Sequence, residues 1–211
     1  MDSNTLHNIS EFKGIATPLF NGVIDFQTLK KSITRYSKFT PKPNELAGAV
    51  FEFVQAMYFK WSGNTSGVQV FDYTPTLNWV DDYGADGYGW DSTRTKRLVV
   101  QAKYRSVSAS LVDDHRTNLD TYVSELIKSY NEFGQVIGII STTTNENASF
   151  GKVYSVQSMN QSRIARTIHN KLIANGITSG VMLRVYDIGY WKLKLTDDLF
   201  WEFLRNQLLA I

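Results

Sequence analysis

The stretch Tyr83–Arg105, YGADGYGWDSTRTKRLVVQAKYR, decides the fold that we predict for this chain. It reads as two β-strands joined by a polar connection, with Asp86 on the first strand. Side chains alternate between the two faces of a strand, so Gln101 and Lys103 share one face of the second strand, with Arg105 beyond them. The opposite face is apolar. A row of amide, ammonium and guanidinium groups beside a carboxylate predicts a functional site in this stretch.

The composition is that of a single globular domain, and it excludes several kinds of site. The chain has 211 residues, 43% of them hydrophobic and 20% charged, so it can bury a substantial core without cross-links. Cysteine is absent, which excludes disulfides, a thiolate nucleophile and Cys-ligated zinc. The three histidines are scattered, so a histidine-based metal cluster is not expected. The net charge of +2 permits nucleic-acid binding but does not argue for it.

No segment has the pattern of a targeting signal or a membrane span. The N-terminal stretch MDSNTLHNISEFKG lacks the apolar core and the basic region of a secretory signal. No apolar run approaches the roughly 20 residues of a membrane-spanning helix. We therefore expect a cytoplasmic protein without membrane contact, and a phage-encoded protein that acts in its host cell fits the same pattern.

Helix and strand patterns alternate along the chain, which predicts an α/β domain with a mixed central β-sheet flanked by helices. Residues 1–25 read as irregular. Helices are predicted over 26–38, 45–60, 117–132, 161–174 and from Asp197 or Asp198 to 209, and strands over 68–72, 136–140, 152–156, 181–186 and 190–195, besides the two in the opening stretch. We expect one domain over 1–211, with a core at about 44–205 and an N-terminal helical extension.

The helix predicted over 45–60 carries a carboxylate in apolar surroundings. Asn44 is a good N-cap for it, and Glu45 lies in its first turn. The helix is apolar on nearly every side, which is typical of a buried helix, yet Glu52 lies in its middle. A buried carboxylate is costly without a partner, so we expect Glu52 to be paired, metal-bound or protonated. Glu45 and Glu52 are seven positions apart, on the same face of the helix.

These side chains suit metal-dependent hydrolysis of a phosphodiester. That reaction needs a metal held by protein ligands, an activated water and a positive group near the developing charge, and Mg²⁺ prefers carboxylate and carbonyl oxygens. Asp86 and Glu52 offer carboxylates, Gln101 offers an amide oxygen, and Lys103 offers a flexible point charge. A plain β-hairpin with solvated polar residues gives the same local pattern, and Glu52 would then be a buried ion pair or a rim residue.

A family resemblance favours the first interpretation. Asp86 within GADGYG, followed by the strand ending in Gln101-Ala-Lys103-Tyr-Arg, resembles the PD-(D/E)XK nuclease superfamily. It resembles most the Q-x-K branch found in type IV restriction enzymes and in restriction-like domains of phage and plasmid helicases. The run Gly48-Ala-Val-Phe-Glu52-Phe-Val resembles the helix of the family that carries an accessory glutamate, and Phe200-Trp201 resembles a pair in its last helix. The resemblance implies a restriction-endonuclease-like fold over about 44–205.

The resemblance implies a metal-dependent DNA endonuclease. Its active site would be Asp86, Gln101, Lys103 and Glu52, in which the two carboxylates and the amide hold Mg²⁺, with Mn²⁺ as a substitute. Lys103 would position or polarise the attacking water. The expected partners are DNA and a second copy of the chain, since double-strand cleavage by one small site per chain usually needs a homodimer.

The chain departs from the commoner family pattern in two places. Gln101 stands where that pattern has an acidic residue, and no proline precedes Asp86. Asp91, in Gly89-Trp-Asp91, is an alternative to Asp86, which we favour for its flanking glycines and its distance from Gln101. Glu45 is an alternative metal ligand. It also reads as a first-turn charge.

Basic side chains suggest where DNA would lie. Arg163, Arg166 and Lys171 form a stripe on the helix predicted over 161–174 that could follow a DNA backbone, although a solvated helix face has the same pattern. Arg105 could contact phosphate or remain a solvated arginine. Two other functions stay open, namely a structure-specific, junction-type nuclease and a non-catalytic DNA-binding or assembly protein. The neutral residue at 101 is the hint for the non-catalytic protein.

Overall fold

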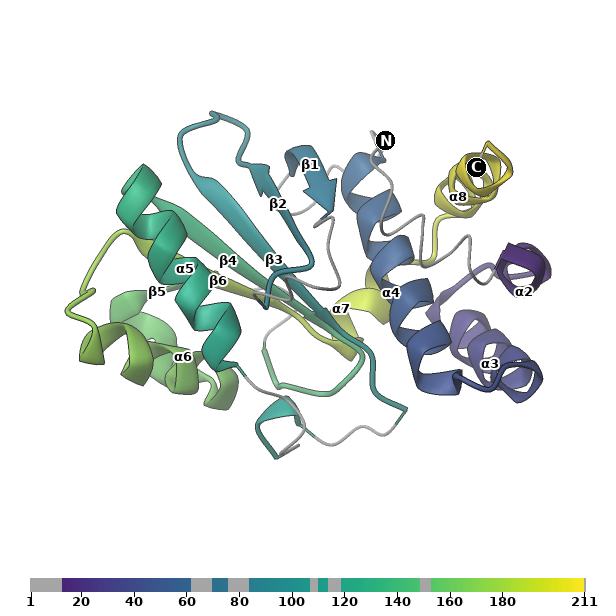
Figure 1. The fold of residues 1–211 in the computed structure, drawn as a ribbon, viewed down its shortest axis with the longest axis horizontal. Coiled ribbons are helices and arrows are strands. Elements are labelled where there is room, and N and C mark those ends of the chain that lie inside the picture. The colour runs from purple at the N-terminus through teal and green to yellow at the C-terminus, as the bar shows by residue number, and fades with distance from the viewer. Residues whose placement is uncertain are drawn as a thin grey trace.

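A six-stranded mixed β-sheet lies between two layers of helices (Figure 1). The structure is a computed structural model, and it describes residues 13–61, 70–75, 84–106, 110–113, 119–148 and 153–210. The α/β class with a mixed sheet flanked by helices, predicted from the sequence, is thereby confirmed.

The sheet joins an antiparallel part to a parallel part. Its strand order is β1-β2-β3-β4-β6-β5. The strands are β1 (Phe71–Pro75), β2 (Gly87–Trp90), β3 (Arg97–Lys103), β4 (Val136–Thr142), β5 (Val153–Ser155) and β6 (Val181–Tyr186). β1, β2 and β3 form an antiparallel meander, β3, β4 and β6 run parallel, and β5 is antiparallel to β6. The three parallel strands therefore end on the same side of the sheet, which we call the carboxyl edge.

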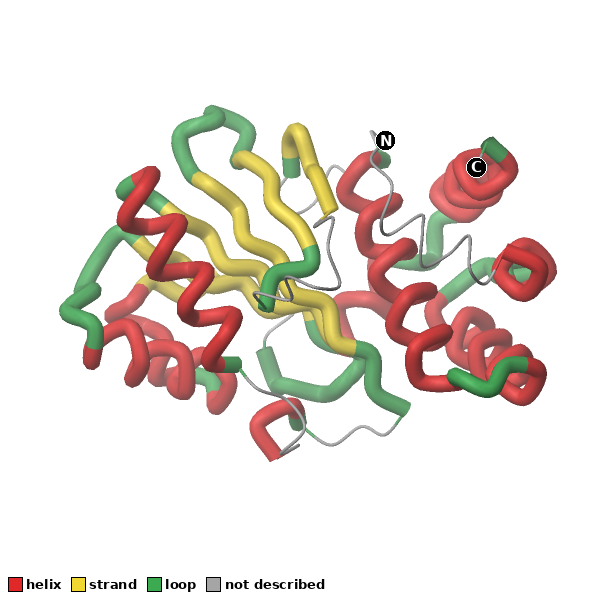
Figure 2. Tube along the Cα trace, viewed as in Figure 1, coloured by secondary structure: helices red, strands yellow, loops and turns green. Residues whose placement is uncertain are grey.

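Each face of the sheet is covered by its own helices (Figure 2). On one face lies α4 (Pro43–Lys60), with α2 (Lys13–Leu19), α3 (Phe26–Tyr36), α7 (Ile188–Lys194) and α8 (Asp198–Leu209) around it. On the other face lie α5 (Asp120–Phe133) and α6 (Arg163–Ala174). Short 3₁₀ turns are η1 (Ser37–Phe39), η2 (Leu111–Asp113) and η3 (Val156–Gln161). None of the helices described is long and apolar enough to cross a membrane.

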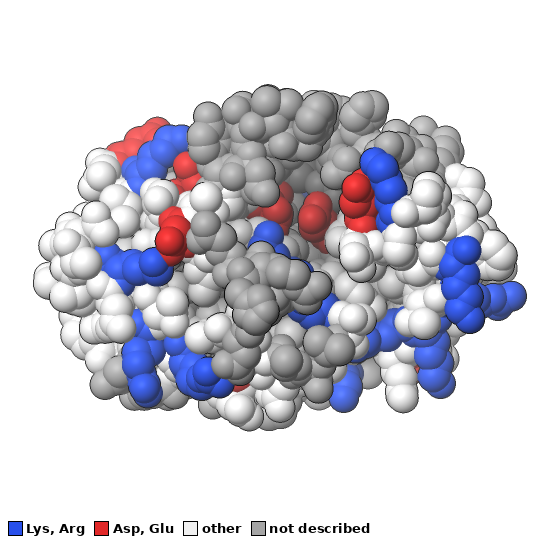
Figure 3. All heavy atoms as spheres, turned by 60° about the horizontal axis from the view of Figure 1, so that its bottom comes forward, with Lys and Arg blue, Asp and Glu red and all other residues white. Residues whose placement is uncertain are grey.

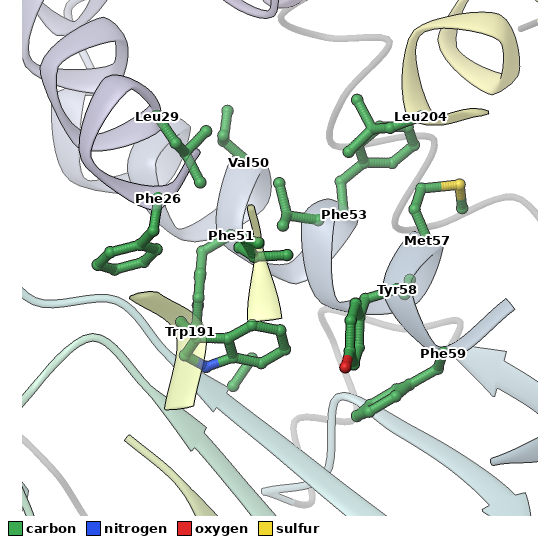
Figure 4. Close-up of a cluster of buried hydrophobic side chains, with 14 of the residues drawn as sticks. Phe26, Leu29, Val50, Phe51, Phe53, Met57, Tyr58, Phe59, Trp191 and Leu204 are labelled. Carbon is green, nitrogen blue, oxygen red and sulfur yellow. The ribbon is translucent and has the colours of Figure 1, made fainter. Parts of the chain in front are cut away.

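Two hydrophobic cores hold the layers together, one on each face. The core under α4 is rich in aromatic rings (Figure 4), with Trp191 packed edge-on against Phe51 and Tyr58 at centroid distances of 5.7 and 5.3 Å. Such edge-to-face pairs add to the stabilisation that burial itself gives. The core under α5 and α6 includes Tyr122 and Leu126. β4 is buried along its whole length, as its apolar sequence predicted.

Several helix ends are set by residues with strong local preferences for that position. Asp25 caps α3, Gly134 ends α5 with a left-handed φ of 71°, and Asp197 rather than Asp198 caps α8. These signals are local, since a side chain or a positive φ satisfies the backbone groups at the end of a helix.

Three local predictions were wrong. The strand predicted over 190–195 is helix α7, which begins where Asp187 accepts backbone N–H groups from Gly189 and Tyr190. A short apolar run fits a strand or a buried helix equally well, so periodicity alone could not decide. The region read as irregular contains α2. Finally, α4 begins at Pro43, one position before the expected cap Asn44, because proline suits the first turn of a helix.

Candidate functional site

Asp86 lies just before β2 and faces the end of β3. Its backbone N–H donates to the Val100 carbonyl at 2.7 Å. Its Oδ2 accepts hydrogen bonds from Gln101 Nε2 at 2.6 Å and from the Ala102 backbone N–H at 2.5 Å. The structure thus brings Asp86 and Gln101 into direct contact. Gln101 is buried and Asp86 is half-buried, so this bond is partly shielded from water, which strengthens it.

The glycines around Asp86 permit close approach of the chain to its neighbours. Gly84 has a φ of +82°, and a Cβ there would lie 2.4 Å from the backbone nitrogen of Tyr122. A Cβ on Gly87 would lie 2.3 Å from the hydroxyl of Tyr73. No real side chain fits at such distances without displacement of the neighbour. Close packing against Tyr122 and Tyr73 therefore explains why Gly84 and Gly87 are glycines in this fold.

Two buried tyrosines border Asp86. The Tyr73 hydroxyl donates to the Asp86 carbonyl at 3.4 Å, and the Tyr122 hydroxyl donates to the Val99 carbonyl at 3.0 Å. Burial and, next, the charge of Asp86 raise the pKa of both phenols, and the charge of Glu52 raises the pKa of Tyr73 further. Both hydroxyls are neutral at physiological pH. No sequence signal separates these two tyrosines from ordinary core aromatics.

A cavity of about 290 Å³ lies at the carboxyl edge, between the first half of α4 and the end of β3. Glu52 and Lys103 both line it, and Gly48 and Arg105 contribute to its wall. Figure 3 brings the lower side of Figure 1 forward and shows acidic and basic side chains together in a hollow. Glu52 is half-buried rather than fully buried. The structure thus brings Glu52 and Lys103 to the same cavity, as a shared site requires.

The candidate residues come from both faces of β3. Val100 and Ala102 point into the core under α4, on the side of Glu52. Val99 points into the core under α5, and Gln101 shares its face by strand alternation. In the row predicted as polar, Gln101 is therefore buried, whereas Lys103 and Arg105 are half-buried. Glu52 and Lys103 share the cavity where β3 ends, whereas Asp86 and Gln101 contact each other and are not part of the cavity wall.

The segment that follows β3 is fastened to the end of β4. The Thr143 hydroxyl accepts a hydrogen bond from the Arg105 backbone N–H at 2.7 Å and donates one to the Arg105 carbonyl at 2.8 Å. Thr144 donates at 2.6 Å to the buried carboxylate of Glu146, which also accepts the Leu111 N–H at 2.7 Å. Thr143 and Thr144 therefore have a structural role at the end of β4.

Oxygen donors of the kind that Mg²⁺ takes are present at this edge. They are the carboxylates of Asp86 and Glu52 and the amide of Gln101, whose nitrogen faces Asp86, so only its oxygen could serve a metal. The described residues contain no group of three or more His, Cys, Asp and Glu side chains placed to hold a metal. Two carboxylates and an amide still fit Mg²⁺, since that ion usually keeps several waters.

The two alternative acidic residues lie away from these contacts. Asp91 is in the turn between β2 and β3, where its Oδ1 accepts the backbone N–H groups of Thr95 and Lys96 at 2.9 and 3.0 Å. It is five positions beyond Asp86 on the hairpin, roughly 16 Å along an extended strand. Glu45 is 60% exposed, pairs with Lys42 at 3.0 Å and is not part of the cavity wall.

The basic candidates divide into two groups. Arg105 lines the cavity, and its guanidinium donates to the Tyr104 carbonyl at 2.8 Å. Arg163 and Arg166 are exposed on α6, in the helical layer opposite α4. Lys171 on the same helix forms an ion pair with Asp120 of α5. The structure therefore brings Arg105 to the candidate site and leaves the α6 residues outside the cavity wall.

Gln55 is a further polar residue near this site that sequence reasoning did not single out. It follows Glu52 by three positions on α4 and is fully buried, and neither polar atom of its amide has a hydrogen-bond partner. The amide lies beside the Tyr73 hydroxyl, but not in the geometry of an ordinary hydrogen bond. An unsatisfied buried amide is costly and is unusual in a native core. The only sequence signal was a polar residue inside an apolar helix.

Comparisons of this chain with models of known protein families, with curated proteins and with solved structures find no match. The support for a function therefore comes from the residues themselves. Its two geometric parts are the contact between Asp86 and Gln101 and the cavity that Glu52 shares with Lys103.

Proposed function

We propose that this chain is a metal-dependent DNA endonuclease that hydrolyses phosphodiester bonds at the carboxyl edge of its sheet. The observation that carries the proposal is the 2.6 Å bond between Gln101 and Asp86, beside a cavity lined by Glu52 and Lys103. This arrangement places two carboxylates, an amide and an ammonium group around one end of β3. The resemblance of the same residues to the Q-x-K branch of the PD-(D/E)XK nucleases supports the same reaction.

Each side chain has a distinct role in this proposal. Asp86 and Glu52 would hold Mg²⁺ with help from the Gln101 oxygen, and Mn²⁺ would substitute for Mg²⁺. The metal would supply Lewis acidity at the phosphate. Lys103 orients the attacking water and offsets charge on the phosphate. Arg105, on the same cavity wall, contacts a phosphate oxygen.

Two copies of the chain would act together on duplex DNA in the cytoplasm. One chain contributes one cavity of this kind, and a single site cuts one strand at a time. A homodimer with two sites cuts both strands without release of the DNA. Analytical ultracentrifugation with and without a duplex measures this state, and a monomer in both conditions contradicts the dimer.

Cleavage of supercoiled plasmid DNA tests the proposal directly. The wild type, Asp86→Ala and Lys103→Ala are incubated with plasmid and Mg²⁺ or Mn²⁺, after circular dichroism shows that all three are folded. We expect nicked and linear products from the wild type and a loss of about 100-fold or more in both variants. Equal cleavage by all three proteins contradicts the proposal, and so does an absence of cleavage across metals and across linear and branched DNA.

A non-catalytic DNA-binding protein is the second candidate. The observation that favours it is the neutral Gln101, which leaves two carboxylates at the site. Fluorescence anisotropy with a labelled duplex, run beside the plasmid assay, separates the two functions. Binding by the wild type without cleavage under any condition supports the second candidate.

A further inference from the structure

A second cavity lies between α3 and α7, apart from the candidate functional site. Its volume is about 430 Å³, larger than the cavity beside Glu52. Lys30 and Gln27 line it from α3, Lys192 lines it from α7, and Thr196 follows α7. Two of these four polar residues are cations from different helices.

The two ammonium groups of this cavity are close enough to repel each other. Burial and, next, the charge of Lys192 lower the pKa of Lys30. Within the described part of the chain, neither lysine has a carboxylate within ion-pair distance. The carboxylate that does line the cavity, Asp25, accepts the Thr28 N–H at 2.6 Å and the Thr28 hydroxyl at 2.7 Å as the cap of α3.

Partial burial and the nearby charge of Lys192 both disfavour the charged form of Lys30. Lys30 is half-buried, whereas Lys192 and the neighbouring Lys31 are exposed to solvent. A partly desolvated cation beside a second cation is less favourable than a cation paired with an anion. Such local departures concentrate at functional sites. An anion between the two lysines would supply the missing charge.

The side chains suit a phosphate. Lysines bind phosphate as point charges, and the several oxygens of a phosphate can face two ammonium groups from different helices. Gln27 can donate from its amide, while the Thr196 hydroxyl already donates to the Leu193 carbonyl at 3.2 Å. The cavity is also roomy. At about 430 Å³, it has room for a phosphate and part of the group attached to it.

The second cavity lies near the same edge of the sheet as the candidate functional site. Ile188 in its wall is two positions beyond Tyr186, the last residue of β6, and β6 runs parallel to β4 and β3. β6 is two strands from β3, which is roughly 10 Å across the sheet. Figure 3 shows Lys and Arg side chains along the lower part of this face, below the hollow. A nucleic-acid strand bound at the hollow would need to extend along this edge to reach the second cavity.

We propose that the cavity between α3 and α7 is a phosphate-binding site, with Lys30 and Lys192 as the two cations that hold the anion. The phosphate chemistry follows from this cavity alone. Its assignment to a backbone phosphate of DNA rests on the proposed nuclease function, and a free phosphate compound is the other source.

Two probes separate these sources. The variants are Lys30→Gln and Lys192→Gln, and the matched control is Lys31→Gln, one position along α3 and outside the cavity wall. Inorganic phosphate is titrated by isothermal calorimetry, and a labelled duplex is titrated by anisotropy in EDTA at several salt concentrations. For the probe that occupies the site, whether phosphate or duplex, both variants should show about tenfold weaker binding than the control. Each lost backbone contact should also lower the salt slope of duplex binding by about 1.

Every outcome bears on the proposal. Weaker duplex binding by Lys30→Gln and Lys192→Gln supports the site with DNA as its source, and weaker binding of inorganic phosphate alone supports it with a free phosphate compound as its source. Equal binding of both probes by the variants and the control overturns it. Thermal unfolding shows whether the variants are folded, and we expect midpoints equal to or above that of the wild type. Plasmid cleavage by the wild type reports separately on the proposed function.

Discussion

The side-chain amide of Gln101 donates a 2.6 Å hydrogen bond to the Asp86 carboxylate, and the same oxygen accepts the Ala102 N–H at 2.5 Å. A neutral donor therefore holds the acidic group in place at the carboxyl edge. A carboxylate at position 101 would instead repel Asp86 at this distance. Gln101 thus stabilises Asp86 even without a metal.

Gln101→Glu should reverse this relationship. Without divalent metal we expect the free energy of unfolding to fall by about 1–3 kcal/mol, because a bond is lost and two carboxylates face each other. Mg²⁺ should restore part of the loss, since a ligand that binds only the folded state stabilises it. Urea unfolding in EDTA and in Mg²⁺ measures both effects. Gln101→Met is the control, which loses the bond but should gain less from Mg²⁺. Stability of Gln101→Glu that does not respond to Mg²⁺ contradicts the metal site.

Glu52 and Glu45 lie on one helix and should differ in function. Glu52 lines the cavity, whereas Glu45 is 60% exposed and pairs with Lys42 at 3.0 Å. We expect Glu52→Gln to lower plasmid cleavage by about 100-fold or more, because one of two carboxylate ligands is lost. Glu45→Gln should cost at most about 0.5 kcal/mol of stability and leave cleavage unchanged. Equal cleavage rates for the two variants would remove Glu52 from the proposed site.

Gly48 offers a way to separate stability from function. It lies inside α4 on the wall of the candidate cavity, and a Cβ there would meet nothing within 4 Å. Gly48→Ala should raise the free energy of unfolding by up to about 1 kcal/mol, since alanine favours the helix. Gly48→Met should keep much of that gain while its side chain fills the cavity. We expect normal cleavage by the alanine variant and at least about tenfold slower cleavage by the methionine variant. Full activity of Gly48→Met would mean that the substrate does not use this cavity.

Local signals in the sequence predicted the elements that local forces determine. The apolar run of β4, the caps Asp25 and Asp197 and the turn at Gly134 each depend on neighbours within a few positions. The strand predicted over 190–195 failed because the same apolar run suits a buried helix, and the Asp187 cap decided for α7.

The residue types of the candidate site could be predicted from the sequence, but the hydrogen bonds and packing that hold these residues in place could not. The spacing of Asp86 and Gln101 indicated a pair, and the structure brings them into contact. The bonds that hold the surroundings join distant positions, as with Arg105 and Thr143, 38 positions apart. Threonines are common in loops, so the sequence alone cannot select this one. The sequence also cannot distinguish Tyr73 from other core aromatics. Only the fold shows that its ring packs directly on Gly87.

Alkaline pH should destabilise the protein through its buried tyrosines. Burial raises the pKa of Tyr58 to about 12, and the pKa of Tyr73, Tyr122 and Tyr190 is also raised. Because the folded-state pKa lies above the unfolded value near 10, this stability is complete below about pH 10 and is lost as the pH rises toward 12. We expect the free energy of unfolding to fall with a slope of up to about 1.4 kcal/mol per pH unit for each phenol.

Tyr58→Phe isolates one of these phenols. The ring keeps its packing against Trp191, while the 3.2 Å bond to the Tyr190 hydroxyl is lost. At neutral pH the variant should lose about 1 kcal/mol. Above pH 10 the free energy of unfolding of the variant should fall less steeply with pH than that of the wild type. The difference should equal the contribution of one phenol. Urea unfolding from pH 8 to pH 11.5 measures both, and parallel curves for the two proteins would show that Tyr58 ionises as easily folded as unfolded.

Gly87→Ala should disturb the fold and the candidate site together. The new Cβ would lie 2.3 Å from the Tyr73 hydroxyl oxygen and within 2.6 Å of two ring carbons, and β2 is paired on both sides, so the clash has no easy relief. We expect a loss of about 1–3 kcal/mol and slower cleavage, since Asp86 is the preceding residue. In a Tyr73→Ala background the same change should cost less, and a double-mutant cycle by urea unfolding measures the difference. Gly14→Ala, with open space around its Cβ, is the control and should be neutral or stabilising. Additive effects of Gly87→Ala and Tyr73→Ala would show that Tyr73 does not impose glycine at position 87.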